Sequence, residues 1–213
     1  MSKIKVSKNG PYLVSDNLPL NKDIIEYDDA GVPLTTEKGK SIPTHPDYAL
    51  CRCGHSKNKP FCDGSHKTSH FDGTENRNAK QKFEKNAGEL IGPDLILKDD
   101  SNLCAGAGFC HRAGGVWNLT ENSDNPQSKQ TAIEECRCCP SGRLVAVDKT
   151  TGKPLEPKLE PSVGVSYNGP LCVKGGVPVE AVDGSIYEIR NRVTLCRCGK
   201  SQNKPFCDGS HLD

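Results

Sequence analysis

The sequence contains few of the side chains that build a large hydrophobic core. Of its 213 residues, 34% are hydrophobic and 5% are aromatic, and there is one Trp and one Met. A chain of this length forms one domain or two to three small ones. Small units with little apolar core usually need disulfides or bound metals for their stability. We therefore expect small units that are held together by cross-links.

Long apolar runs and a surplus of either charge are also missing. No segment approaches the roughly 20 apolar residues of a membrane span. The 28 Lys and Arg residues nearly balance the 27 Asp and Glu residues, for a net charge of +1. The basic run RNAKQKFEK, residues 77–85, is interrupted by Glu84 and is interpreted as a solvated surface segment. Neither a nucleic-acid partner nor a membrane partner is expected.

Cysteine, in contrast, is abundant, with 12 residues in the chain. In a secreted protein this number would indicate a set of disulfides. The N-terminal stretch MSKIKVSKNGPYLV has neither an apolar signal region nor a cleavage site of small residues, and so favours a cytoplasmic protein. Cytoplasmic cysteines stay reduced, so clustered ones are better explained as metal ligands than as disulfides.

One block of sequence occurs twice. CRCGHSKNKPFCDGSH, residues 51–66, returns as CRCGKSQNKPFCDGSH, residues 196–211. Upstream, residues 9–20 align without gaps with residues 168–179, and in both a Gly-Pro turn precedes short apolar runs that are typical of strands. The stretch between these strands and the cysteine block is longer in the first copy, which therefore carries an insertion there.

A different unit lies between the two copies. Residues 94–99 are expected to form a strand, and residues 143–157 a strand, a Gly-containing turn and a second strand. Residues 67–90 and the Pro-rich residues 154–162 are expected to be linkers. Trp117 and Cys172 are assigned to core packing. The domains are thus predicted as residues 1–72, 73–160 and 161–213.

Each copy of the block arranges three Cys and one His in the pattern C-x-C-x8-C-x3-H. Two cysteines one residue apart can face the same metal only from an extended or turn backbone. Asp63 and Asp208 follow the third cysteine and are good helix N-caps, so a helix beginning there would bring the histidine round to the same side. The spacing alone leaves zinc and an iron–sulfur cluster both open. The candidate ligands are Cys51, Cys53, Cys62, His66, Cys196, Cys198, Cys207 and His211.

The block CRCGxSxNKPFCDGSH resembles the CDGSH iron–sulfur domain family. The resemblance covers both blocks and the strand regions upstream of them. It implies one [2Fe–2S] cluster in each copy, held by three Cys and one His, in a β-rich fold with a small strand cap. By resemblance to family members with two motifs, the copies are expected to pair within one chain about a pseudo-twofold axis. Zinc becomes the lesser alternative.

The histidine ligand implies chemistry that a fourth thiolate would not supply. A neutral imidazole in place of a thiolate removes negative charge from the cluster and raises its reduction potential. We expect His66 and His211 to face solvent, so that acid releases the clusters. A histidine that merely completes a rigid site is the alternative.

The middle unit carries its cysteines in two groups. Cys104 and Cys110 lie in CAGAGFC, and the second group, CRCCPSGRL, begins at Cys136. A Cys-Pro pair at the end of such a series closes the cluster sites of bacterial ferredoxins. Residues 92–150 resemble a divergent single-cluster ferredoxin domain, although the central cysteine of the usual run is missing between Cys104 and Cys110.

This resemblance implies a [4Fe–4S] cluster held by Cys104, Cys110 and Cys139. The fourth ligand is Cys136 or Cys138. We predict Cys136, because its C-x2-C spacing to Cys139 bends round a cluster more easily than two adjacent cysteines do. A [3Fe–4S] cluster with three thiolates is the fallback, and a zinc site or free thiols are the alternatives.

The predicted fold is a β-rich α+β chain, in which two small cluster-binding lobes pair with each other around an inserted ferredoxin-like domain. No motif suggests substrate turnover, so an enzyme is not expected, although a subunit that transfers electrons for a separate oxidoreductase is compatible. We predict a cytoplasmic, monomeric electron carrier with an internal pseudo-dimer, which acts on an unidentified redox partner or apo-protein acceptor. Delivery of clusters or iron, sensing of redox state or pH, and a structural zinc module are the alternatives.

Overall fold

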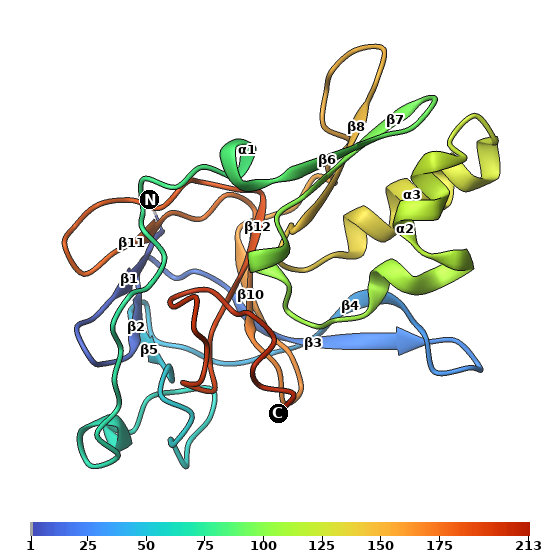
Figure 1. The fold of residues 1–213 in the computed structure, drawn as a ribbon. Helices are drawn as coiled ribbons and strands as arrows, with labels where there is room; N and C mark the ends of the chain where they lie inside the picture. Colours follow the sequence, from blue (N-terminus) through green and yellow to red (C-terminus); the bar gives the residue numbers. More distant parts are fainter. Residues whose placement is uncertain (1) are drawn as a thin grey trace.

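The structure, a computed structural model, describes residues 2–213 and contains three small β-sheets with a few short helices (Figure 1). The β-rich α+β class is confirmed. None of the helices within residues 2–213 is long and apolar enough to cross a membrane. The helical segments are η1 (Ser65–Lys67), α1 (Phe83–Asn86), η2 (Ser101–Leu103), η3 (Phe109–Gly114), α2 (Val116–Glu121) and α3 (Pro126–Cys138).

The first sheet combines strands from both copies of the repeat, in the order β11-β1-β2-β5. β1 and β2 alternate between buried and exposed side chains, as expected for a sheet with one face on a core. β11 joins β1 in parallel, with Ile4 paired to Val179. The four strands are β1 (Ile4–Val6), β2 (Tyr12–Val14) and β5 (Tyr48–Leu50) from the first copy, and β11 (Val179–Glu180) from the second.

The second sheet also combines strands from both copies of the repeat, in the order β12-β10-β9-β3-β4. Here β3 from the first copy runs parallel to β9 from the second, with Leu20 paired to Val163. The strands are β3 (Leu20–Tyr27) and β4 (Pro33–Ser41) from the first copy, and β9 (Ser162–Val165), β10 (Leu171–Lys174) and β12 (Arg192–Leu195) from the second.

The two parallel pairings are reciprocal. In the repeat, Leu20 aligns with Val179 and Ile4 aligns with Val163. Each copy therefore lends its third strand to the sheet of the other copy. The β3–β4 hairpin accounts for the extra length of the first copy, because its counterpart β11 has only 2 residues.

The third sheet belongs to the middle unit and has the antiparallel order β6-β7-β8. Its strands are β6 (Gly88–Ile91), β7 (Leu95–Asp99) and β8 (Leu144–Asp148). The strand predicted over residues 94–99 is confirmed by β7. The second strand predicted after β8 is reduced to one bridge between Val147 and Pro154.

The helices α2 and α3 lie beside this sheet (Figure 1). The side chain of Asn125 accepts hydrogen bonds from the backbone N–H groups of Gln127 and Ser128, and Pro126 occupies the first turn of α3. At its other end α3 continues to Cys138, so the chain leaves the helix directly before Cys139. This exit places the Cys-Pro pair shortly before the first residue of β8.

The apolar side chains form two cores. The larger one draws on equivalent positions of both copies, such as Ile4 with Val163 and Leu50 with Leu195. The smaller one belongs to the middle unit, with Trp117 half-buried at its edge. Cys172 is 2% exposed within β10, which confirms its packing role.

The segment over residues 67–90 is more structured than a linker. It contains α1 and the beginning of β6. Arg77, which we expected on a solvated surface, is buried, and one of its guanidinium nitrogens lies 2.8 Å from the carboxylate of buried Asp100. The expectation is wrong at Arg77 because its partner Asp100 lies 23 residues later in the chain, directly after β7, and could not be identified from the local composition.

Candidate metal centres

In each repeated block the four predicted ligands come together as two pairs. In the first block the sulfurs of Cys51 and Cys53 lie 3.9 Å apart, and the sulfur of Cys62 lies 3.4 Å from Nδ1 of His66. The second block repeats this arrangement, with a sulfur–sulfur distance of 3.7 Å between Cys196 and Cys198. There the sulfur of Cys207 lies 3.4 Å from Nδ1 of His211.

The loop between the two pairs folds back onto the strand that precedes it. The N–H of Cys51 donates to the carbonyl of Pro60 (2.8 Å), and the N–H of Cys62 donates to the carbonyl of Ala49 (2.9 Å). The equivalent bonds of the second block hold Cys196 and Cys207 beside the end of β12. The strand and the returning loop thus deliver one pair each to the same place.

The helix predicted after the third cysteine is absent from both described blocks. The first block has the single 3₁₀ turn η1, and the second has only a turn. Asp63 instead accepts hydrogen bonds from the N–H groups of Lys57 (2.8 Å) and Ser65 (3.0 Å), and Asp208 makes the matching pair of contacts. The prediction is wrong because an Asp that caps a helix and an Asp that ties a loop have the same local sequence.

The first cysteine of each thiol pair is more buried than the histidine of its block. Cys51 and Cys196 are fully buried, whereas His66 and His211 are both partly exposed, as we expected for ligands that reach solvent. Within the second pair, the mutual hydrogen bond raises the pKa of Cys196 and lowers the pKa of Cys198. One thiolate therefore forms readily at this pair, and a bound metal would displace the second proton. Release of the clusters by acid stays a prediction.

The two blocks touch each other through their backbones. A Cβ placed on Gly54 would lie 2.3 Å from the carbonyl oxygen of Cys198, and one on Gly199 would lie 2.6 Å from that of Cys53. Tyr12, fully buried, donates its hydroxyl to the carbonyls of Cys196 and Pro205, both at 2.9 Å. Sequence reasoning missed Tyr12 as a support of the second site, because the aligned residue of the other copy is Leu171 and carries no such signal.

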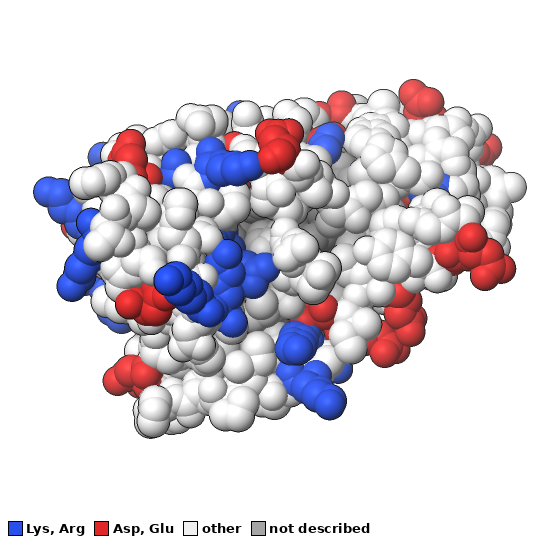
Figure 2. Space-filling view, turned by 90° about the horizontal axis from the view of Figure 1, so that it is seen from below, with Lys and Arg blue, Asp and Glu red and all other residues white. Residues whose placement is uncertain are grey.

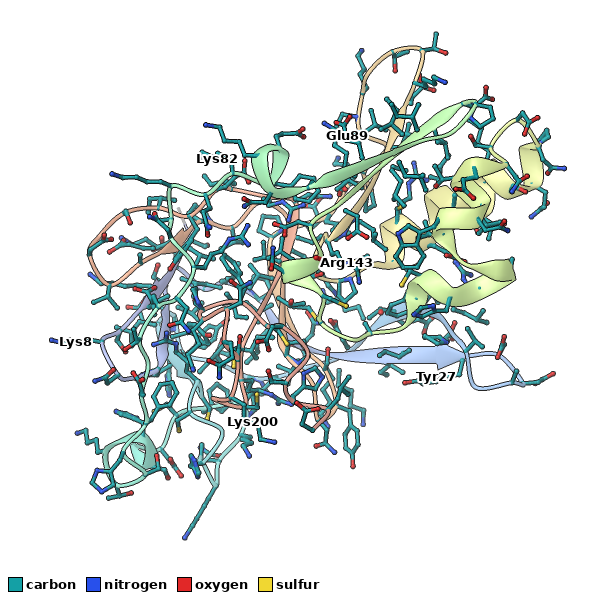
Figure 3. The ribbon with its side chains drawn as sticks, viewed as in Figure 1. Lys8, Tyr27, Lys82, Glu89, Arg143 and Lys200 are labelled. Carbon is teal, nitrogen blue, oxygen red and sulfur yellow. The ribbon has the colours of Figure 1, made fainter. Side chains whose placement is uncertain are left out.

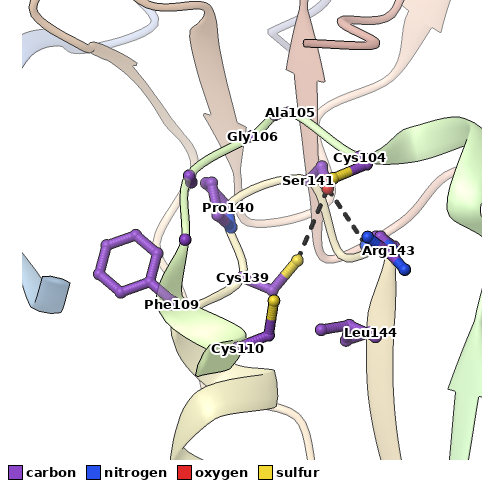
Figure 4. Close-up of a pocket in the computed structure, with 12 residues that line it drawn as sticks. Cys104, Ala105, Gly106, Phe109, Cys110, Cys139, Pro140, Ser141, Arg143 and Leu144 are labelled. Atoms are coloured by element: carbon purple, nitrogen blue, oxygen red, sulfur yellow. Dashed lines mark hydrogen bonds between the residues drawn. The ribbon is translucent and has the colours of Figure 1, made fainter. Parts of the chain in front are cut away.

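The middle unit contains a cavity lined by three of its predicted ligands, Cys104, Cys110 and Cys139 (Figure 4). Burial raises the pKa of Cys110 to about 11, so the neutral thiol persists until a metal takes its proton. The loop from Ala105 to Phe109 forms one wall. Ser141 and Arg143 line the cavity as well, and neither was identified from the sequence.

Cys136 and Cys138, the two candidates for the fourth ligand, do not line the middle cavity. Cys136 is buried on α3, and its backbone carbonyl accepts a hydrogen bond from Arg192 (2.7 Å). The thiol of Cys138 donates to the carbonyl of Leu34 in β4 (3.4 Å) and so faces the first copy of the repeat. The choice of Cys136 stays a prediction, as does the number of irons.

Comparison with known families matches the whole layout. A family model described as the iron-binding zinc finger of the CDGSH type matches residues 9–67 and 168–212. A second model, described as a divergent 4Fe-4S mono-cluster, matches residues 90–149. The chain is a tandem CDGSH protein with a ferredoxin-like unit between its two motifs. Searches of curated proteins and of solved structures find no match.

The Cys-x-Cys pairs of the tandem CDGSH protein have the separation of two thiolates that share one metal. With a metal–sulfur bond of about 2.3 Å, two thiolates on one tetrahedral metal lie about 3.8 Å apart. Both Cys-x-Cys pairs have this separation. Yet within residues 2–213 no group of three or more His, Cys, Asp or Glu is close enough to hold one metal ion. Each block therefore presents its predicted ligands as one pair of thiols and one Cys–His pair, and the family matches support iron–sulfur binding in this chain.

Proposed function

We propose that the tandem CDGSH protein is an electron carrier with one [2Fe–2S] cluster in each terminal block and one [4Fe–4S] cluster in the middle unit. Bound iron–sulfur clusters supply one-electron chemistry whose potential depends on ligands, hydrogen bonds and exposure. In this proposal Cys51, Cys53, Cys62 and His66 hold the first cluster, and Cys196, Cys198, Cys207 and His211 hold the second. Cys104, Cys110 and Cys139, with Cys136 as the predicted fourth ligand, hold the third.

The close contacts of the second block with both the first block and the middle unit carry the proposal. Gly54 and Gly199 bring the two terminal blocks together, as described above. The second block also meets the middle cavity, since a Cβ on Gly209 would lie 3.5 Å from the carbonyl oxygen of Cys104, and the side chain of Asn203 donates to the carbonyl of Asn102 (2.8 Å). Electron tunnelling weakens steeply with distance, so adjacent sites favour a carrier over three independent structural metals.

The chain's own residues would control charge and water at these sites. A neutral imidazole at His66 and His211 carries less negative charge than a thiolate and favours the reduced state. Because Nδ1 of each ring faces a cysteine sulfur, Nε2 is the nitrogen left to exchange a proton with solvent. Cys51, Cys53 and Cys196 are buried and limit the access of water at their end of each site, whereas Cys198 is partly exposed.

We further propose that the two lobes pair about a pseudo-twofold axis within a monomer. The reciprocal strand exchange and the reciprocal Gly54–Cys198 and Gly199–Cys53 contacts support this pairing. Both signs of charge occur on the face in Figure 2, which suits a protein partner better than a nucleic acid. We also propose a reducing compartment such as the cytoplasm, since the clustered cysteines act as metal ligands and not as disulfides in this proposal. We also propose that the protein has no catalytic activity of its own.

Delivery of clusters to an acceptor is the second candidate. The observation in its favour is that Cys62 and His66 are both partly exposed, so one end of the first site is open to another molecule. Transfer to an apo-acceptor that is abolished in His66→Cys and His211→Cys would support delivery. Repeated reduction and reoxidation without loss of iron supports the carrier.

The first experiment is Mössbauer spectroscopy of anaerobically purified protein, with analysis of iron, sulfide and zinc. We expect about eight irons per chain, divided between [2Fe–2S] and [4Fe–4S] signals. About four irons, all in [2Fe–2S] signals, would remove the third cluster from the proposal. Zinc without sulfide would overturn it.

A further inference from the structure

Two polar side chains share the wall of the middle cavity with the three thiols. Ser141 and Arg143 lie on the short segment between α3 and β8. Ser141 is 2% exposed, and its Oγ lies 3.6 Å from the sulfur of Cys139 (Figure 4). A buried hydroxyl beside a ligand sulfur needs a hydrogen-bond partner, and the sulfur is in reach.

The direction of this hydrogen bond follows from the neighbouring contacts. The Oγ of Ser141 accepts from the backbone N–H of Arg143 (3.3 Å), which leaves its own hydrogen free to be donated. Cys139 as a metal ligand is a thiolate and has no hydrogen to give. Pro140, directly after Cys139, has no backbone N–H. The hydroxyl of Ser141 is therefore the donor and the sulfur of Cys139 is the acceptor.

Arg143 holds this arrangement in place. Its guanidinium makes two hydrogen bonds to Asp99, at 2.6 and 2.8 Å, and these raise the pKa of Arg143 further above its ordinary value. The indole N–H of Trp117 donates to the same carboxylate (3.3 Å). In Figure 3, Arg143 lies toward the middle of the molecule, where Arg190 of the second copy donates to the carbonyl of Gly142. The segment that carries Ser141 is thus fixed from both sides.

We propose that Ser141 is a positioning residue that donates a hydrogen bond to the Cys139 thiolate and thereby raises the reduction potential of the middle cluster, with Arg143 orienting the hydroxyl. Reduction adds negative charge to a cluster and its sulfurs, so a donor at the sulfur stabilises the reduced state more than the oxidised state. The inference rests on the proposed cluster in the middle unit. It makes Ser141 a determinant of potential and not a ligand.

The test compares Ser141→Ala with Ser123→Ala as a matched control. Ser123 is also a buried serine of the middle unit, but its hydroxyl accepts from the N–H groups of Asp94 and Leu95, away from the cavity. We expect Ser141→Ala to keep the iron and sulfide content. The equilibrium constant for one-electron reduction of the middle cluster should fall about tenfold, which equals about 59 mV. Ser123→Ala should leave that potential unchanged, and the two terminal clusters serve as internal references in both variants.

A second measurement compares the wild type with two variants of Ser141. Exchange into D2O should shift a resonance Raman band of the iron–thiolate stretch in the wild type and in Ser141→Thr, which keeps the hydroxyl, but shift it less in Ser141→Ala. An unchanged potential in Ser141→Ala, or an equal isotope shift in its spectrum, overturns the inference. Conversion of the cluster type in Ser141→Ala would make Ser141 a ligand and also overturn it. If Ser141→Ala fails to fold, the absence of an isotope shift in the wild type decides against it. A middle unit without iron would overturn the proposed function as well, whereas the other outcomes leave that function standing.

Discussion

Gly54 and Cys198 meet at the junction of the two CDGSH blocks, so closely that a Cβ on Gly54 would lie 2.3 Å from the carbonyl oxygen of Cys198. The mirror contact joins Gly199 to Cys53, and both glycines have φ of 82°. Each glycine sits one residue after the second cysteine of its block. The backbones of the two terminal sites therefore pack directly against each other. A substitution at the contact in one block should also affect metal binding in the other block.

Gly54→Ala should release iron from both terminal sites. The new methyl group meets the backbone of Cys198, which cannot move aside as a flexible side chain would, and the positive φ adds about 1–2 kcal/mol. Gly31→Ala is the matched control, because Gly31 has φ of 79° and nothing within 4 Å of its Cβ position. Iron content and thermal unfolding check the prediction. Equal stability of the two variants would contradict a close contact between Gly54 and Cys198.

Tyr12→Phe should weaken the second site although Tyr12 belongs to the first copy. Its hydroxyl bonds to the carbonyls of Cys196 and Pro205 in a fully buried setting, where loss of the donor costs about 1–3 kcal/mol. Tyr48→Phe is the control, since that hydroxyl bonds within the first copy, to the carbonyl of Leu18. Iron loss to a chelator, followed spectroscopically, should accelerate at the second site in Tyr12→Phe and stay at the wild-type rate in Tyr48→Phe.

The first CDGSH site should lose its iron before the second. Cys62 and Phe61 are partly exposed, whereas the equivalent Cys207 and Phe206 are 2% and 6% exposed. A chelator therefore reaches the Cys62–His66 end of the first site more easily than the equivalent end of the second. Loss of absorbance should occur in two phases, and His66→Cys, which marks the first site by its altered spectrum, should assign the faster phase. A faster phase from the second site would contradict the exposure argument.

Glu135 should make stability fall as the pH rises toward neutrality. The side chain is fully buried, and neither carboxylate oxygen has a hydrogen-bond partner among the described residues. Burial raises the pKa of Glu135 to about 7, although Arg112, at 3.9 Å, opposes this rise. Because the folded pKa is the higher one, the stabilising contribution of the protonated acid is complete below the ordinary pKa and is lost as the pH rises through about 7.

Glu135→Gln should remove this dependence. Its free energy of unfolding should exceed that of the wild type at pH 8 and approach it at pH 6, as measured by chemical denaturation of anaerobic protein. Glu134→Gln alters the adjacent, exposed carboxylate and serves as the control. A pH profile of Glu135→Gln that parallels the wild type would show that Glu135 is not the titrating group.

Local patterns sufficed where the groups that act together are close in the chain. The pairs Cys51–Cys53 and Cys62–His66 are each set within one loop, and the repeat itself identifies the second set. Local patterns failed where two structures share one signature, as at Asp63, which ties a loop instead of capping a helix. They also left open the role of Cys136, because the continuation of α3 to Cys138 holds Cys136 on a helix and away from the cavity.

The sequence by itself determined the β-rich class, the tandem CDGSH blocks and the ferredoxin-like unit between them, since ligand spacing and repeat are properties of neighbouring residues. Only the tertiary structure decided that the copies exchange strands, that Tyr12 supports the opposite site and that Ser141 reaches Cys139 at the wall of the middle cavity. The physical reason is that the exchange and the Tyr12 contact join segments far apart in the chain. The Ser141 contact is short in sequence, but its meaning depends on burial by the other walls of the cavity. Such burial is a property of the packed chain, and no single stretch of sequence contains it.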